Sequence, residues 1–372
     1  MARPKIVVNV AAALQRRGAP TDTGVAFVVF AGAAGPTEPV ECKSKADAVT
    51  ASVPDSVATW IGDILNQGAP KVWALRATAL DVDAVTEAEW TTALDLLARD
   101  LGPGQVLIPG VTDSAAHGAL LAHSAAFGRT VLLDVAEDAD AATVAAAATG
   151  LAAGEGSDKA TICDGWSILP GPAGVARKVP ASVITAGLVG RNDATAGHAN
   201  NAPAGDQGRG AGFVNGALGI VTPRTDAELD TLHDAGVSTY RSIRGQVQLY
   251  GWVSLSTDAR FRQLNWGRMA MQLQYGLASL NEKFLFRQID GQGLLFAEVE
   301  GANRGYLKPL WTAGALYGAT ADDAFDVDVA GVNSPETTAA GELHSAVAVS
   351  FSPHTEQVVV DVTTKVVEGV AA

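Results

Sequence analysis

Short, continuously apolar segments alternate with longer helical segments between Thr21 and Asp193. Apolar strands joined by helices of this length are typical of a mostly parallel sheet covered by helices on both faces. Thr86, Asp113 and Asp140 are residue types that cap helix N-termini. The first half is therefore predicted to be α/β. Its expected strands are Val25–Phe30, Val72–Leu75, Val106–Ile108, Thr130–Leu133 and Ala160–Cys163, and its expected helices are Asp55–Leu65, Thr86–Arg99, Asp113–Phe127 and Ala139–Ala153.

The second half has a different pattern. Residues 192–217 are rich in Gly, Ala and Asn and show little periodicity, which is typical of a functional loop or a connection between domains. Beyond them we expect helices at Asp226–Ala235, Phe261–Asn281 and Asn303–Tyr317, and β-rich segments at Thr239–Tyr250, Ala324–Val329, Ser345–Phe351 and Gln357–Val367. The predicted fold class is α/β plus α+β. Its four parts are an N-terminal linker arm (1–20), an α/β domain (21–217), an α+β domain (218–355) and a C-terminal β arm (356–372).

The composition excludes several functional classes. A formal net charge of −14 argues against general binding to nucleic acid or to membrane surfaces, both of which need basic patches. No segment approaches the ~20 consecutive apolar residues of a membrane span. The two cysteines, Cys42 and Cys163, cannot form a disulfide framework or a Cys-rich zinc site.

Charge is unevenly distributed along the second half. Between Tyr240 and Leu310 there are nine Lys and Arg residues against five acidic ones, and from Trp311 onward one basic residue against nine acidic ones. Such a division favours complementary contacts between copies of the chain or with a partner. Two solvated faces without a partner would have the same composition. The basic residues that we select for such a contact are Arg260, Arg262, Arg268, Lys283 and Arg287.

Known catalytic and cofactor motifs do not emerge from the sequence. The glycines of residues 205–212 do not form a G-x-G-x-x-G between a strand and a helix, and no phosphate-binding G-x-x-x-x-G-K-[ST] occurs. His117 and His123 are six residues apart, whereas paired helical metal ligands are three or four apart. We therefore predict no catalytic residue, no cofactor and no metal site.

Both ends of the chain carry isolated segments with strong β-propensity. Ile6, Val7 and Val8 precede a link that contains Gly18 and Pro20, and near the other end Val358, Val360 and Val362 would share one face of a strand. A lone strand is not stable in water, so each segment must join a sheet. That sheet could belong to the same subunit, or to a neighbour in an assembly held by main-chain hydrogen bonds.

Several motifs, in order, resemble the contractile-tail sheath proteins of bacteriophages, which are related to the sheaths of R-type pyocins and other contractile injection systems. The resemblance is densest over the second half. Two departures are the absence of an Arg from the run Tyr250–Leu255 and the extra residue in Pro353–Glu356. The matching segments are Pro180–Asp193 with the Ala202–Gly205 loop, Gly245–Asp258, Phe261–Arg268, Leu307–Gly318, and Asn333, Gly341 and Pro353–Glu356.

The resemblance implies a structural subunit and not an enzyme. Many copies would form a helical sheath of stacked rings around a tail tube, and contraction would drive the tube through a target cell envelope. The implied partners are further copies of the chain, the tube protein, and the baseplate and tail terminator proteins; the implied location is the virion tail. Residues 218–355 would be the sheath core domain, the basic residues would face the tube or a neighbour, and both arms would join adjacent subunits. The alternatives are a soluble α/β enzyme with an unrecognised site, or another phage assembly protein of the capsid or baseplate.

Overall fold

The computed structural model describes residues 22–362, and its largest element is an eight-stranded sheet with the strand order β11-β10-β6-β5-β4-β1-β3-β2. The strands from β10 to β3 run parallel, and the edge strands β11 and β2 pair antiparallel with their neighbours. The predicted, mostly parallel sheet is confirmed. Its strands are β1 (Ala26–Phe30), β2 (Val40–Cys42), β3 (Val72–Arg76), β4 (Gln105–Leu107), β5 (Thr130–Asp134), β6 (Ala160–Asp164), β10 (Val237–Ile243) and β11 (Gln246–Leu249).

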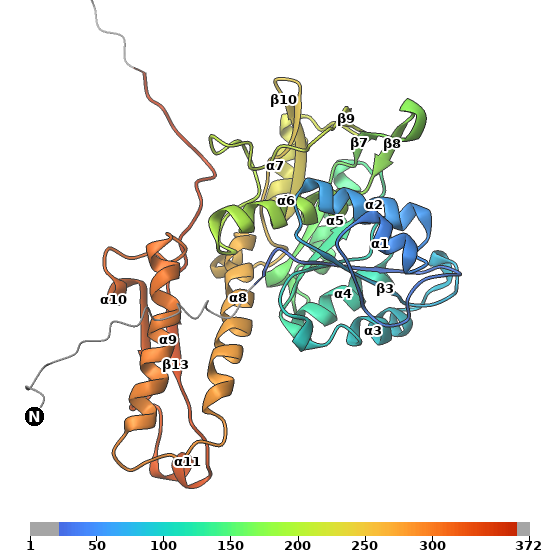
Figure 1. Ribbon diagram of the computed structural model, residues 1–372. Coiled ribbons are helices and arrows are strands. Elements are labelled where there is room, and N and C mark those ends of the chain that lie inside the picture. Colours follow the sequence, from blue (N-terminus) through green and yellow to red (C-terminus); the bar gives the residue numbers. More distant parts are fainter. Residues whose placement is uncertain (1–21, 363–372) are drawn as a thin grey trace, which may run out of the picture.

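Helices cover both faces of this sheet (Figure 1). In β1, Ala26, Val28 and Phe30 belong to the core on one face, and Phe27 and Val29 to the core on the other, because successive strand residues point to opposite sides. Burial on both faces is why the strand is apolar throughout. One face carries α1 (Lys45–Thr50), α2 (Asp55–Gln67) and α6 (Ala181–Ala196), and the other carries α3 (Glu87–Asp95), α4 (Ser114–Phe127), α5 (Ala141–Leu151) and α7 (Asp226–Asp234).

The three helix caps predicted from the sequence are present. The Thr86 side chain accepts a hydrogen bond from the amide of Glu89, whose carboxylate accepts one from the amide of Thr86. Asp113 and Asp140 each accept a hydrogen bond from the amide three residues later. These caps satisfy backbone donors that have no partner within the helix, and so they determine where α3, α4 and α5 begin.

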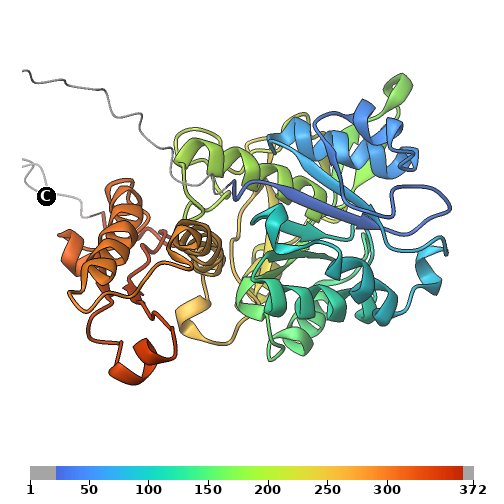
Figure 2. The same cartoon turned by 60° about the horizontal axis from the view of Figure 1, so that its bottom comes forward.

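A second, elongated lobe extends from this α/β body (Figures 1 and 2). We define the lobe as residues 264–352. Its core includes Met269 and Leu273 of the long helix, and Val299 and Leu307 of the next. β12 and β13 form a two-stranded antiparallel sheet against these helices, as the predicted α+β character requires. The elements are α8 (Leu264–Asn281), α9 (Leu294–Thr312), α10 (Ala321–Ala324), β12 (Phe325–Asp328), α11 (Pro335–Ala339) and β13 (Ala346–Val349).

Other parts differ from the sequence prediction. β10 and β11 lie beyond residue 217, in the segment assigned to the second domain, yet they extend the large sheet because β10 pairs with β6. The helix expected at Asn303–Tyr317 is α9, which begins earlier because the Asp290 carboxylate accepts hydrogen bonds from the amides of Leu294 and Leu295. α6 occupies the start of the expected 192–217 loop. A further small sheet contains β7 (Ser167–Pro170), β8 (Ala176–Val179) and β9 (Gly219–Ile220).

Candidate assembly surfaces

The C-terminal segment beyond Glu356 is extended and exposed. Val358, Val360 and Val362 are 77%, 74% and 84% exposed, and Val359 on the opposite side is 73% exposed. Residues 357–362 form no strand in the single chain, and the rest of the expected strand lies outside the described residues, as do Ile6, Val7 and Val8. Four exposed valines within five residues, without a covering element among residues 22–362, form an apolar surface of the kind that marks an interaction site.

The root of this segment is bonded firmly to the start of α8. Gln263 makes two reciprocal hydrogen bonds with the backbone of His354: its Nε2 donates to the carbonyl oxygen at 3.0 Å, and its Oε1 accepts from the amide at 3.0 Å. The carbonyl oxygen of Ser352 accepts hydrogen bonds from Asn200 Nδ2 at 2.9 Å and from Trp266 Nε1 at 3.2 Å. This pattern imitates the pairing of a β-ladder, with side chains in place of a partner strand.

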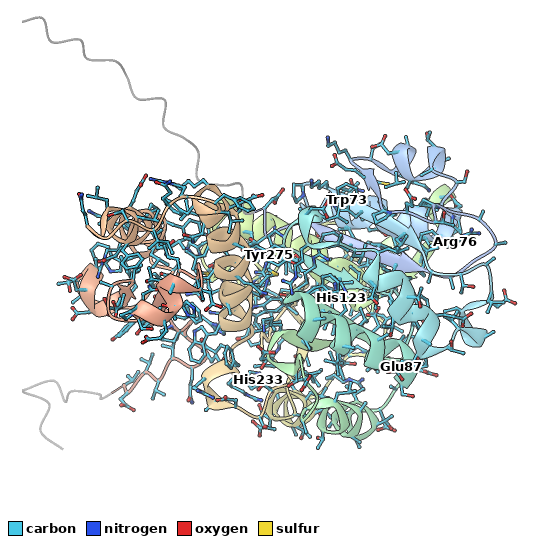
Figure 3. The ribbon with its side chains drawn as sticks, turned by 90° about the horizontal axis from the view of Figure 1, so that it is seen from below. Trp73, Arg76, Glu87, His123, His233 and Tyr275 are labelled. Atoms are coloured by element: carbon cyan, nitrogen blue, oxygen red, sulfur yellow. The ribbon has the colours of Figure 1, made fainter. Side chains whose placement is uncertain are left out.

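Within the described part of the segment, Glu356 is the last residue that forms an ion pair or hydrogen bond with the rest of the protein. Its carboxylate lies 3.2 Å from His354 Nε2 and 3.7 Å from His233 Nε2 on α7; Figure 3 labels His233. Burial lowers the pKa of His354, and the Glu356 carboxylate partly offsets this because it favours the imidazolium. His354 Nδ1 also contacts Asn265 Oδ1 at 2.9 Å, so its two ring nitrogens connect α8 to Glu356.

The N-terminal end of the described chain is held in a similar way. The carbonyl oxygen of Thr23 accepts hydrogen bonds from Gln105 Nε2 at 2.7 Å and from Arg268 Nη2 at 3.3 Å. The Thr23 hydroxyl donates to Asp193 at 2.5 Å, and the same carboxylate binds Arg268 at 2.6 Å. Thr23 is 3% exposed, so the chain enters the body at a buried point.

The five basic residues selected from the sequence do not form one surface. The prediction that Arg268 faces the tube or a neighbour is wrong, because Arg268 is fully buried and paired with Asp193. Arg260 is exposed and paired with Asp258, and Arg262 donates to the carbonyl oxygens of His233 and Asp234. Lys283 and Arg287 lie at the other end of α8, and a helix of that length separates the two groups by about 27 Å.

The turn after α8 combines basic and apolar exposed side chains. Lys283 lies over the ring of Phe284 at 4.8 Å, and Arg287 pairs with Glu298 at 2.7 Å. Between them Leu285 is 66% exposed and Phe286 is fully exposed. Phe286 has φ of 62°, a left-handed conformation that is strained for an aromatic residue. The charge count did not reveal this apolar tip, although the sequence Phe-Leu-Phe between two basic residues could have indicated it.

The β12–β13 hairpin is a candidate acceptor for another strand. β12 and β13 pair only with each other in the sheets of the described chain, so each has one side without a partner strand. The acidic side chains beside β12 are paired with a base: Arg304 of α9 lies 3.1, 3.6 and 3.1 Å from Glu300, Asp322 and Asp326. A two-stranded sheet is marginal by itself, so a further strand would stabilise it.

A groove of about 1300 Å³ lies between the edge of the large sheet and the C-terminal root. Its walls come from the 200–207 loop, α7, the β10–β11 hairpin and residues 354–358; they include Arg241, Tyr250, Trp252 and Glu356. The sequence could not indicate this groove, because its walls come from segments far apart along the chain. It opens beside the point where the C-terminal segment leaves the body.

The group of side chains that most resembles a catalytic cluster is buried, and its polar atoms bind one another. Asp134, at the carboxyl end of β5, accepts hydrogen bonds from the amides of Gly110 and Ser182 and from the Ser182 hydroxyl at 2.5 Å. Burial raises the pKa of Asp134 to about 6, and Ser182 is fully buried. This carboxylate caps the start of α6, where Pro180 provides no side-chain cap. It therefore completes a helix end at the edge where open α/β sheets often bind ligands.

Neither the grouping of potential metal ligands in residues 22–362 nor the burial of the two cysteines favours metal or thiol chemistry. Within that range no group of three or more His, Cys, Asp or Glu side chains is arranged to hold a metal ion. Cys42 and Cys163 are free and buried, and burial raises the pKa of the Cys42 thiol to about 11, which disfavours the nucleophilic thiolate. None of the helices in this range is both long and apolar enough to cross a membrane.

Comparison with known proteins identifies the fold. No protein-family model matches the chain, and no curated protein matches it. Solved structures do match over 98% of the chain: a chain of the anti-feeding prophage (AFP) baseplate (TM-score 0.75, 18% identity, 100% of that chain), the AFP helical sheath in the contracted state (0.73, 18%, 100%) and the contracted sheath complex of the extracellular contractile injection system PVC (0.73, 15%, 98%). The chain has the fold of contractile sheath proteins, as the sequence resemblance predicted.

Proposed function

We propose that this protein is the structural subunit of a contractile sheath, which polymerises around a tail tube and contracts to drive that tube through a cell envelope. The observation that carries the proposal is the match to sheath structures over almost the whole chain. The closed Asp134 cluster and the buried thiols agree with a role in which packing between copies, and not catalysis, is the activity. Assembly would take place in the host bacterium, and the sheath would reside in the virion tail.

The physical basis of contraction would be two packings of the same folded subunit. The extended lattice is metastable, and the contracted lattice has the lower free energy, so a trigger at the baseplate releases the difference. The body has a core on each face of its sheet and the lobe has its own, which suits subunits that move as rigid bodies. In this account the free energy of contraction is stored in contacts between subunits.

The two terminal arms would connect the lattice. Among residues 22–362 no element covers the exposed valines of residues 358–362, and no third strand pairs with the β12–β13 hairpin. An arm that joined the hairpin of an adjacent subunit would cover its own valines and fill an unpaired side of the hairpin. A strand donated in this way gains main-chain hydrogen bonds along its length. The N-terminal residues Ile6, Val7 and Val8 would serve as the second donor.

The tube or a neighbouring subunit would contact the turn after α8. Lys283, Phe286 and Arg287 expose charge and apolar surface together at the far end of the lobe. Arg260 and Arg262, at the opposite end of α8, would meet a neighbour. The baseplate and a tail terminator would bind the ends of the polymer, since its end subunits lack one neighbour.

Truncation of the C-terminal arm tests this function. The full chain should assemble into hollow cylinders visible by negative-stain microscopy. A chain that ends at Glu356 should keep its melting temperature, because the deleted valines make no core contacts, yet remain a monomer. Cylinders of full length from the shortened chain would contradict arm donation. A discrete monomer or small oligomer from the full chain would contradict the sheath itself.

A further inference from the structure

The two ends of the described chain are bonded to the same short stretch of one helix. The C-terminal root (residues 352–356) contacts Gln263 and Trp266, and the N-terminal root (Thr23) contacts Arg268. These positions lie within six residues at the start of α8, and the first and last are about 7.5 Å apart along a helix axis. We call Gln263, Asn265, Trp266 and Arg268 the arm junction. Figure 1 shows the C-terminal segment leaving near this end of the lobe.

The junction holds the main chain of both ends, either directly or through Asn200. Gln263 holds both the amide and the carbonyl of His354, and Arg268 holds the carbonyl of Thr23. Asn265 Nδ2 donates to Asn200 Oδ1 at 2.6 Å, and Asn200 in turn donates to the Ser352 carbonyl. The roots therefore cannot slide along α8 without breaking several hydrogen bonds together.

The contacts stop abruptly on the C-terminal side. Ser352, His354 and Glu356 are each bonded, whereas the valines that follow Gln357 are more than 70% exposed. On the N-terminal side Arg268 and Asp193, which hold Thr23, are both buried. On the C-terminal side, the bonded main chain therefore ends at Glu356.

We infer that the arm junction passes tension from one arm to the other within a subunit and sets the length of each free arm. This deepens the proposed function and rests on it, since tension arises only when neighbours hold the arms. Release of residues 352–356 would add about 17 Å of slack, at ~3.4 Å per extended residue. A donated strand with that freedom loses its register, and a shift of one residue turns its apolar side chains to the wrong face. Gln263 and Arg268 are therefore positioning residues for the arms.

The chain offers a matched control for Gln263. Gln67 makes the same reciprocal pair with the backbone of Asn215, with both hydrogen bonds 2.9 Å long, and neither bond involves Thr23 or residues 352–356. Gln263→Ala and Gln67→Ala should each leave a folded monomer with a similar, small loss of melting temperature. In Gln263→Ala alone, hydrogen exchange at the His354 amide should rise about tenfold, which corresponds to ~1.4 kcal/mol.

Assembled cylinders provide the decisive measurement. After contraction or shear, cylinders of full-length Gln263→Ala should break into fragments several-fold more often than those of wild type or Gln67→Ala. Equal breakage in all three would overturn the inference. Failure of the wild-type chain to form cylinders would instead refute the proposed function, so the two failures are distinguishable.

A second pair of variants tests the N-terminal root. In Arg268→Met/Asp193→Leu both charges are removed, which avoids an unpaired buried charge. Arg224→Met/Asp164→Leu is the matched control, because that pair is also buried and bidentate, at 2.8 and 2.9 Å, and has no contact with an arm root. Increased fragmentation with the first variant alone supports the inference. Similar fragmentation with both, or with neither, contradicts it.

Discussion

Arg268 on α8 and Asp193 on α6 form a buried ion pair, 2.6 Å apart, that joins the lobe to the α/β body. Arg268 also donates to the carbonyl oxygen of Ala199, and Asp193 accepts from the Thr23 hydroxyl. Three segments of the chain therefore meet at one pair of charges. Such a pair contributes little when compared with apolar residues of the same size, but loss of one partner leaves a buried charge.

The first prediction concerns this pair. Arg268→Met should reduce the free energy of unfolding by ~3–5 kcal/mol, because Asp193 would lose its charged partner in a buried site. Arg268→Met/Asp193→Leu should recover most of that loss. Urea unfolding of the monomer at neutral pH measures both. A single variant as stable as wild type would mean that solvent reaches Asp193.

A pair of glycine substitutions tests the packing of α6 on α2. A Cβ at Gly187 would lie 2.3 Å from the Cβ of Gln67 and 2.6 Å from the carbonyl oxygen of Ile64, whereas one at Gly305 in α9 would meet nothing within 4 Å. Gly187→Ala should therefore destabilise the chain by ~1–3 kcal/mol through overpacking. Gly305→Ala should stabilise it by ~0.5–1 kcal/mol, because Ala loses less conformational freedom in a helix. Thermal unfolding measures both changes in stability. Changes of the same sign in the two variants would contradict the close packing of α6 on α2.

Asp134 predicts a specific pH dependence. Burial raises its pKa in the folded protein to about 6 from 3.8, so between those values the folded state binds more protons than the unfolded state. Stability from this group is then complete below pH 3.8 and decreases as the pH rises to about 6, by up to ~3 kcal/mol. Asp134→Asn should remove this component. The difference between the wild-type and Asp134→Asn unfolding free energies should change across that window, and a constant difference would contradict a raised pKa.

Individual residues show how much of the fold could be predicted from the sequence. The apolar run of β1 and the caps Thr86, Asp113 and Asp140 act through neighbours in the sequence, so the parallel sheet and its helix starts were predictable. Arg268 shows the limit. A charge count placed it on a surface, but its partner Asp193 is 75 positions away, and only the fold brings them together.

The junction and the groove were unpredictable for the same reason. Gln263 and His354 are 91 positions apart, and a glutamine at a helix start has no local feature that marks a main-chain partner. The extension of the sheet by β10 depended on pairing with β6, which the hydrophobic pattern of residues 237–243 cannot specify. The acidic residues of β12 were visible as composition, but their location on a strand with one unpaired side among the described residues was not.

The turn after α8 gives a prediction about the tube. Lys283→Glu should lower co-assembly of sheath and tube, more strongly at low salt, because surface charge pairs are screened as ionic strength rises. Lys308→Glu is the control, an exposed lysine near the other end of α9. Co-sedimentation at two salt concentrations measures the effect. If both substitutions changed co-assembly equally, the turn would face solvent and not the tube.

Contraction itself is tested most directly by the lengths of assembled cylinders. Cylinders built from the full chain should be imaged by electron microscopy before and after a destabilising trigger such as mild denaturant. We predict two discrete lengths, the shorter one wider, with the body and the lobe of each subunit unchanged in fold and only their placement altered. A single length under every condition, or shortening that unfolds the subunit, would contradict a contractile sheath.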